Sequence, residues 1–181
     1  NQEQLIRFAR ELLSRDVDDE EFTRQAAAFA RERREVTQVT WLNARRVPRA
    51  TYWAFPYRAE SMVPGEQPDA ALPVEGSGSA PEKAFRAARD QRQPVYSIGF
   101  KDPVGNAAFQ LYVPLVERGR FNGALIVEYS IEGLLRHFVP PDVARRHHIS
   151  IIGEQQAVLA STVTPMPGQL QRRATLVHLA P

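Results

Sequence analysis

Two nearly unbroken hydrophobic runs, separated by a short polar break, mark the middle of the chain. The first run is Phe109–Val116 and the second is Gly123–Tyr129, with Glu117-Arg118-Gly119-Arg120 between them. Glycine adopts positive φ readily, and two apolar runs around such a turn are typical of an antiparallel hairpin. Strands that are apolar on both faces lie in the interior of a sheet. The pattern therefore predicts a central hairpin, followed by a short helix that Ser130 caps.

The first 35 residues show helical rather than strand periodicity. One apolar stripe recurs at helical spacing between residues 1 and 15, and it comprises Leu5, Phe8, Ala9, Leu12 and Leu13. A second stripe comprises Phe22, Ala26, Phe29 and Ala30. Asp18, followed by Glu21 three residues later, resembles a capping box at the start of the second helix. The stripes predict packing on the back of the sheet, with a dimer seam as the alternative.

Three further strands and one helix are predicted on either side of a long loop. The strands are Val36–Leu42, Arg49–Phe55 and Val95–Phe100, and the helix is Pro81–Gln91, capped by Ser79. Strict alternation in the first strand places Val36, Thr40 and Leu42 on one face and Thr37, Val39 and Trp41 on the other. The loop Pro56–Pro81 is rich in proline and glycine, and a loop of this length in a compact domain is usually functional or disordered.

The expected fold class is α+β: an N-terminal long helix or helix pair packed on an antiparallel sheet of about five strands. After Pro140-Pro141, which ends the capped helix, Ile149–Ile152 and Ala157–Ala160 predict one more hairpin. We expect residues 1–35 to form a helical segment and 36–140 the core. Residues 141–181 then form either a β extension or the start of a second, truncated unit.

The central hairpin resembles the extracytoplasmic PAS-like sensor domains of bacterial receptors, the Cache or PDC family. The matching residues are Pro114 at the end of a strand, Gly119 in the turn, Gly123 opening the last strand and Glu128 within it, followed by Ser130-Ile131 and Leu134-Leu135. The resemblance covers roughly Phe22 to Ser161. It implies a PAS-like sheet, a sensory role, and an extracytoplasmic, periplasmic location within an inner-membrane receptor such as a histidine kinase.

The amino-acid composition argues against several classes of partner and site. The formal net charge is +2 and no block of like charge dominates, so nucleic-acid binding is not indicated. The chain has no cysteine, which excludes disulfides and thiolate metal sites. No apolar run approaches the roughly 18 residues of a membrane span. We therefore expect a segment of a longer receptor that meets the membrane only through flanking segments.

No motif for catalysis, metal or cofactor binding is present. The four histidines (His137, His147, His148 and His178) form no HExxH pattern, and there is no GxSxG, Walker or GxGxxG motif. We expect neither an enzyme nor a cofactor. A hydrolase is the weakest alternative, and it requires His147 or His137 beside a serine and a carboxylate.

A small-molecule pocket has better support, because such pockets combine aromatic walls with a few orienting polar groups. The candidate ligand-binding residues are Trp53, Phe55, Arg58, Tyr96, Gln110, Tyr112 and Glu128. If Arg118-Gly119 is a two-residue turn, Phe109 lies opposite Glu128. One extra residue places Gln110 there instead, so the register stays open.

Glu128 is the most informative of these residues, because a carboxylate in an apolar run costs several kcal/mol to bury without a partner. In the resembling family an acidic residue at the matching place can hold a ligand's amino group, although it is usually Asp. The alternative is a structural ion pair with Arg49 or Arg58. The expected function is binding of a small polar metabolite, such as a carboxylate or amino acid, between the sheet and the loop Pro56–Pro81. The alternative is a ligand-free structural module, and a homodimer through the N-terminal helix is compatible with both.

Overall fold

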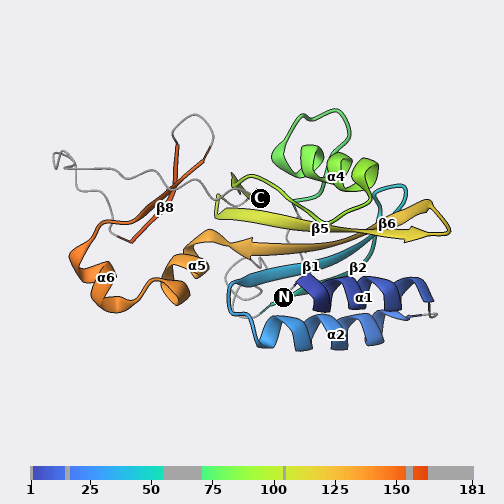
Figure 1. The fold of residues 1–181 in the computed structure, drawn as a ribbon, viewed down its shortest axis with the longest axis horizontal. Helices are drawn as coiled ribbons and strands as arrows, with labels where there is room; N and C mark the ends of the chain where they lie inside the picture. Colours follow the sequence, from blue (N-terminus) through green and yellow to red (C-terminus); the bar gives the residue numbers. More distant parts are fainter. Residues whose placement is uncertain (1, 15–16, 55–70, 104, 154–156, 163–181) are drawn as a thin grey trace.

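The computed structural model describes residues 2–14, 17–54, 71–103, 105–153 and 157–162. Helices α1 (Gln2–Ser14) and α2 (Asp19–Arg31) lie on one side of an antiparallel sheet, and α4 (Ala80–Gln91) lies on the other (Figure 1). The strands are β1 (Val36–Asn43), β2 (Pro48–Trp53), β3 (Val95–Tyr96), β4 (Phe100–Lys101), β5 (Ala107–Glu117) and β6 (Arg120–Ser130). Their order in the described residues is β2-β1-β6-β5-β3, and β4 also pairs with β5. The predicted α+β class is confirmed.

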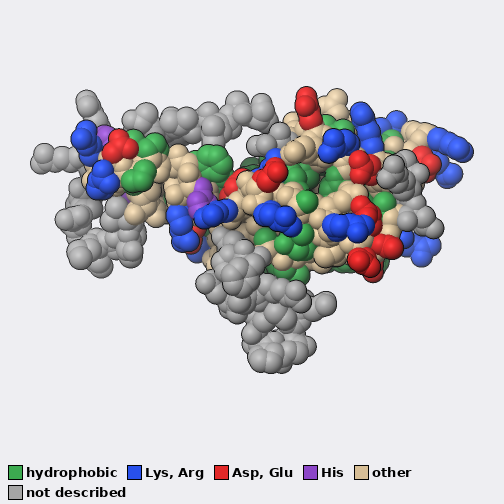
Figure 2. Space-filling model, turned by 90° about the horizontal axis from the view of Figure 1, so that it is seen from below, with side chains coloured by type: hydrophobic (Ala, Val, Ile, Leu, Met, Phe, Trp, Pro, Cys, Tyr) green, Lys and Arg blue, Asp and Glu red, His purple; other side chains and the backbone are tan. Residues whose placement is uncertain are grey.

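The two N-terminal helices bury their apolar stripes against the sheet. Leu5 and Phe8 of α1 and Phe22 of α2 join one core cluster with Trp41 and Leu125 of the sheet. The Asp18 carboxylate caps α2 by accepting a hydrogen bond from the Glu21 amide at 2.8 Å, as predicted. Figure 2, viewed from this side, shows acidic and basic side chains scattered over the surface. The stripes therefore serve internal packing rather than an exposed apolar seam.

The β5–β6 hairpin has a two-residue turn and an additional bulge. Arg118 and Gly119 both have positive φ (48° and 76°), the combination that the favoured two-residue hairpin turn requires. One extra residue in β6 then shifts the register between Val116↔Phe121 and Leu115↔Gly123. The bulge therefore places Gln110 opposite Glu128, which settles the register that the sequence left open.

Gly123 occupies a position that only glycine fits. Its φ is +146°, and a Cβ built there would lie 2.0 Å from the carbonyl oxygen of Leu42 on the neighbouring strand. The close approach holds β6 against β1 at the bulge, which keeps both strands in the centre of the sheet.

A second bulge, in β1, changes the faces that strict alternation predicts. The register with β6 shifts between Val36 and Gln38, so Val36 joins the helix-side core together with Val39. Thr37 instead lies on the opposite face, where its hydroxyl contacts the Glu128 side chain. The predicted assignment of Val36 and Thr37 is therefore wrong, because the bulge inserts one residue.

The predicted third strand, Val95–Phe100, is broken into β3 and β4. Between them Ser97 replaces ladder pairing with a local arrangement: its amide donates to the Gln110 carbonyl at 2.7 Å, and its hydroxyl accepts from the Gln110 amide at 2.8 Å. The predicted second strand, Arg49–Phe55, corresponds to β2, which ends at Trp53.

Helix α4 covers part of the sheet face opposite α1 and α2. Ser79 caps it by accepting from the Glu82 amide at 3.3 Å, as predicted. Its Phe85 and Ala88 pack with Tyr112 and Ile126 in a second core cluster. Buried Glu82 forms an ion pair with Arg46 of the β1–β2 turn, and the Arg46 guanidinium stacks 4.7 Å from the centre of the Phe85 ring. These contacts fix α4 to the sheet.

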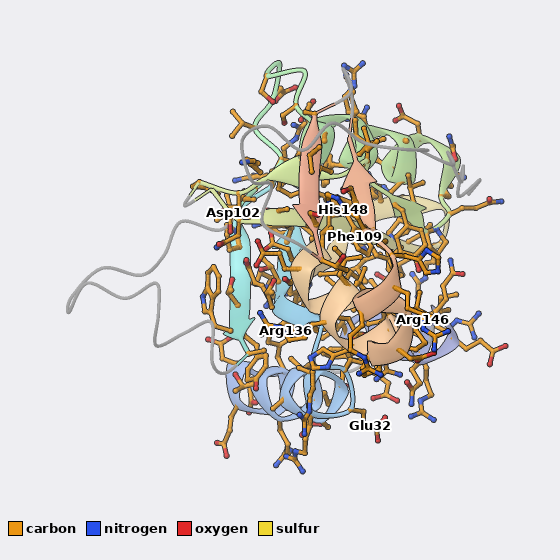
Figure 3. All side chains as sticks on the ribbon, turned by 90° about the vertical axis from the view of Figure 1, so that its left-hand side faces the viewer. Glu32, Asp102, Phe109, Arg136, Arg146 and His148 are labelled. Atoms are coloured by element: carbon orange, nitrogen blue, oxygen red, sulfur yellow. The ribbon has the colours of Figure 1, made fainter. Side chains whose placement is uncertain are left out.

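The C-terminal part begins where Ser130 caps α5 (Ile131–Phe138), accepting from the Gly133 amide at 3.0 Å. Pro141 then opens α6 (Pro141–Arg146), a short helix that the sequence analysis missed. The hairpin of β7 (Ser150–Ile152) and β8 (Val158–Ser161) follows and packs through Ala160 on α5. Figure 3 looks onto this end, where Arg136, Arg146 and His148 are labelled. Among the described helices, none is long and apolar enough to cross a bilayer.

Candidate functional site

A row of polar side chains crosses the sheet on the face that α4 partly covers. Trp53 of β2, Gln38 of β1, Glu128 of β6 and Gln110 of β5 are successive cross-strand partners. Side chains of directly opposite residues in an antiparallel sheet project from the same face, with their Cβ atoms about 5 Å apart. Gln38, Glu128 and Gln110 are only 4%, 5% and 2% exposed. We call these four residues the polar row.

The Glu128 carboxylate accepts one hydrogen bond on each oxygen, and both donors are neutral. The Thr37 hydroxyl donates to Oε1 at 3.0 Å, and the Gln110 side-chain amide donates to Oε2 at 2.8 Å. In the described part of the chain, no Arg or Lys forms an ion pair with this carboxylate. A carboxylate has about four lone-pair sites, so Glu128 retains capacity to accept further donors.

Burial raises the pKa of Glu128, and the hydrogen bonds from Gln110 and Thr37 offset part of that rise. The nearby Asp102 carboxylate raises the pKa slightly further. The predicted alternative of a structural ion pair is not formed with Arg49, whose guanidinium lies 4.3 Å from the centre of the Trp41 ring, a helix-side residue. Arg58, the other candidate, lies outside the described residues.

Gln110 links the row to the end of the long loop and to the second core cluster. Its side-chain amide also donates to the backbone carbonyl of Ala71 at 2.9 Å, while its Oε1 accepts from the Tyr112 hydroxyl at 2.5 Å. Tyr112 is fully buried and meets Phe85 edge-on, with ring centres 6.3 Å apart. Burial, together with the nearby Glu128 carboxylate, raises the pKa of Tyr112 well above its usual value, so the hydroxyl is a donor. The Gln110 side chain is held in one orientation.

Gln38 is buried with one half of its amide unused. Its Nε2 donates to the Thr40 hydroxyl at 2.6 Å, but its Oε1 has no hydrogen-bond partner among the residues that the structure describes. Buried side-chain acceptors without a partner are rare in folded proteins, and each one calls for an explanation.

The structure brings together four of the seven predicted ligand-binding residues. Trp53, Gln110 and Glu128 share the polar row, and Tyr112 lies two residues along β5 on the same face. Phe55 and Arg58 lie outside the described residues.

Tyr96 is not part of this group. It pairs with Leu111, a residue of the helix-side core, and its half-exposed ring lies 6.1 Å from that of Phe109. The aromatic contact continues from Phe109 to Tyr129. Tyr96 therefore projects from the opposite face of the sheet to Glu128.

Sequence reasoning missed Gln38 and Thr37. Both lie in β1 where the bulge occurs, and strict alternation gave no reason to place them on one face. A polar triplet at Thr37, Gln38 and Thr40 within a strand that is otherwise buried was the available signal.

No group of three metal-ligating side chains occurs among the residues that the structure describes. The histidine that contacts serine side chains is His148. Its Nε2 lies 2.5 Å from Ser161 Oγ and 3.2 Å from Ser150 Oγ, at the surface of the C-terminal hairpin. Neither His147 nor His137 makes the serine contact that the hydrolase alternative required in the described residues.

Solved structures with a similar fold include ligand-binding parts of bacterial receptors. The ligand-binding domain of the amino acid chemoreceptor PctB of Pseudomonas aeruginosa PAO1, in complex with L-Gln, matches with a TM-score of 0.52 and 11% identity over 86% of this chain and 57% of that one. An extracellular ligand binding receptor of Desulfohalobium retbaense matches with a TM-score of 0.50 and 15% identity, over 71% and 21% of the two chains. The chain therefore shares the fold of these two receptor structures.

At these identities the likeness establishes the fold alone. This chain spans 57% of the PctB ligand-binding domain and 21% of the Desulfohalobium receptor. The extracellular domain of a putative histidine kinase is also similar, at 13% identity, 83% and 57% coverage and a TM-score of 0.47. No family model and no curated protein matches the sequence.

Proposed function

We propose that this chain is an extracytoplasmic sensor domain that binds a small polar metabolite, such as an amino acid or a carboxylate, against the polar row. The observation that carries the proposal is the buried Glu128 carboxylate, which meets only neutral donors in the described residues. Burying such a charge costs several kcal/mol, which a ligand that interacts with it would recover. The similarity to receptor domains, one of them in complex with L-Gln, supports a ligand of this size.

The surroundings of the row favour a binding face over a purely structural one. A ligand-free module would fill this sheet face with apolar side chains, as Ala124 and Ile126 do beneath α4. The row instead continues the face with Gln38, Glu128 and Gln110, whose side chains present amide and carboxylate groups. Such a combination of an apolar wall with a few orienting polar groups is typical of small-molecule sites.

The bond from Gln110 to Ala71 connects the row to the loop Pro56–Pro81. We propose that ligand binding favours one arrangement of this loop and of the helices behind the sheet, because a ligand shifts a conformational equilibrium through its different affinity for the two states. The parent would be a membrane receptor such as a histidine kinase, with residues 36–140 as the sensor core. A homodimer through the N-terminal helix would have to use the outer surface of α1.

The test is a thermal-shift screen of the domain at pH 7.5 with the twenty L-amino acids, γ-aminobutyrate and a set of organic acids. A binder at a hundred times its Kd adds about 2.7 kcal/mol of stability. We expect at least one compound to raise the Tm, and Glu128→Gln to abolish the shift.

Glu132→Gln is the matched control, because this glutamate is exposed on α5. It should bind like the wild type. The proposal fails if no compound stabilises the domain, or if Glu128→Gln binds as well as the control.

A further inference from the structure

Gln38 provides an acceptor next to Glu128 whose direction is set by its own strand. The Thr40 hydroxyl lies 3.4 Å from the Thr51 hydroxyl, to which it donates, so it accepts from the Gln38 amide nitrogen at 2.6 Å. This contact directs Nε2 towards Thr40, and within the described ranges Oε1 has no hydrogen-bond partner. The side chain is only 4% exposed, so solvent does not satisfy the oxygen in bulk.

The donors of Gln110 and Thr37, two described neighbours of Glu128, are directed elsewhere. Gln110 uses its side-chain amide on Glu128 and on the Ala71 carbonyl, and the Thr37 hydroxyl is directed at Glu128. The cross-strand partner of Gln38 in the β1–β6 ladder is Glu128, whose carboxylate is also an acceptor. Two buried acceptors on adjacent strands are complementary to one group that carries several N–H donors. A ligand carboxylate would meet acceptors on both sides and be repelled.

We infer that Gln38 is a recognition residue, which acts with Glu128 to select ligands that present a primary ammonium or primary amide nitrogen to the polar row. The inference rests on the proposed ligand-binding function and narrows it. Glu128 supplies the charge complement. Gln38 supplies a second acceptor at a fixed position, so a nitrogen must offer at least two N–H groups to satisfy both. Methylated nitrogens lose donors and gain bulk at this place, and ammonium-free acids lack the donor altogether.

The experiment combines one substitution with a ligand series, measured by isothermal titration calorimetry at pH 7.5. The probes are the twenty L-amino acids, γ-aminobutyrate, succinate and malate, followed by the N-methyl and N,N-dimethyl derivatives of the tightest-binding amine. Gln38→Met keeps the length of the side chain and removes the acceptor. Gln25→Met is the matched control, because Gln25 bonds only to Glu21 within α2 in the described contacts, on the other side of the sheet.

We expect the tightest ligand to carry a primary nitrogen and Gln38→Met to weaken it by about 10- to 100-fold, the effect of one lost hydrogen bond to a charged group. The Tm of the ligand-free variant should equal or exceed that of the wild type, because an unpaired buried acceptor is removed. A merely structural glutamine would lower it. Gln25→Met should bind like the wild type. N,N-dimethylation, which leaves a single N–H, should weaken binding to the wild type by a larger factor than binding to Gln38→Met.

Two results would overturn the inference while leaving the proposed function standing. One is that only succinate, malate or other ligands without an N–H donor bind, with Glu128→Gln still abolishing binding. The other is that Gln38→Met binds the amine as tightly as the wild type, which would assign the free oxygen to a structural water. If no probe binds, the inference falls together with the proposed function. Should Gln38→Met fail to fold, the methylation series on the wild type decides, since unchanged affinity for the N,N-dimethyl derivative contradicts the two-acceptor requirement.

Discussion

Replacing Glu128 with glutamine tests how the buried carboxyl is held, because the substitution keeps its shape and removes its charge. Burial raises the pKa of Glu128 above the ordinary value of 4.5. The folded state therefore binds this proton more tightly than the unfolded state. The contribution of the group to stability is fully present below about pH 4.5 and is lost as the pH rises through the folded-state pKa. Above that pKa the wild type carries the whole penalty.

The size of the effect follows from two terms. At pH 4 the protonated carboxyl and the amide differ by about one hydrogen bond, because either Thr37 or Gln110 then faces an NH₂ group, so the variant is less stable by about 1 kcal/mol. As the pH rises between the two pKa values, the wild type loses about 1.4 kcal/mol per pH unit, and the variant does not. The difference in the free energy of unfolding therefore moves in favour of the variant as the pH rises.

The assay is urea denaturation of the ligand-free wild type and Glu128→Gln at half-unit steps from pH 4 to pH 8. A stabilising ion pair would produce the opposite trend: glutamine would cost about 3–5 kcal/mol at neutral pH and less in acid, where the carboxyl is protonated. Observing that trend would refute the description of Glu128 as a buried group held by neutral donors.

Three further outcomes are expected from urea or thermal denaturation. Gly123→Ala should lose about 2–5 kcal/mol, because its Cβ would meet the adjacent strand's carbonyl at 2.0 Å and its φ is +146°; a loss below 1 kcal/mol would contradict the close approach. Tyr112→Phe should lose about 1–3 kcal/mol, because the Gln110 oxygen loses its donor, and an unchanged stability would place that bond in doubt. Arg46→Met should lower the free energy of unfolding by about 3 kcal/mol, because it leaves the buried Glu82 carboxylate without its ion-pair partner. Adding Glu82→Gln should recover part of the loss, and additive losses would contradict the pairing.

The helices, their caps and the central hairpin could be predicted because the signals are local. Asp18, Ser79 and Ser130 cap helices as expected, since a side-chain oxygen before an apolar stripe can satisfy a free backbone amide. The hairpin turn at Arg118-Gly119 followed from the need for positive φ.

The arrangement of the polar row could not be predicted from alternation, because two bulges each shift a strand by one residue. The bulge in β6 places Gln110, rather than Phe109, opposite Glu128. The bulge in β1 turns Thr37 towards that same carboxylate. Bulges depend on contacts across strands, and the close approach of Gly123 to β1 became visible only in three dimensions. Tyr96 lies on the other face because it pairs with Leu111, a residue of the helix-side core, and this pairing register was not readable from the sequence.

The most direct test of ligand recognition by the polar row is a crystal structure of the domain with the tightest-binding compound from the screen. We predict that a ligand nitrogen lies within about 3.2 Å of a Glu128 carboxylate oxygen and within the same distance of Gln38 Oε1. A ligand bound elsewhere on the domain, with the polar row unchanged and untouched, would contradict the account.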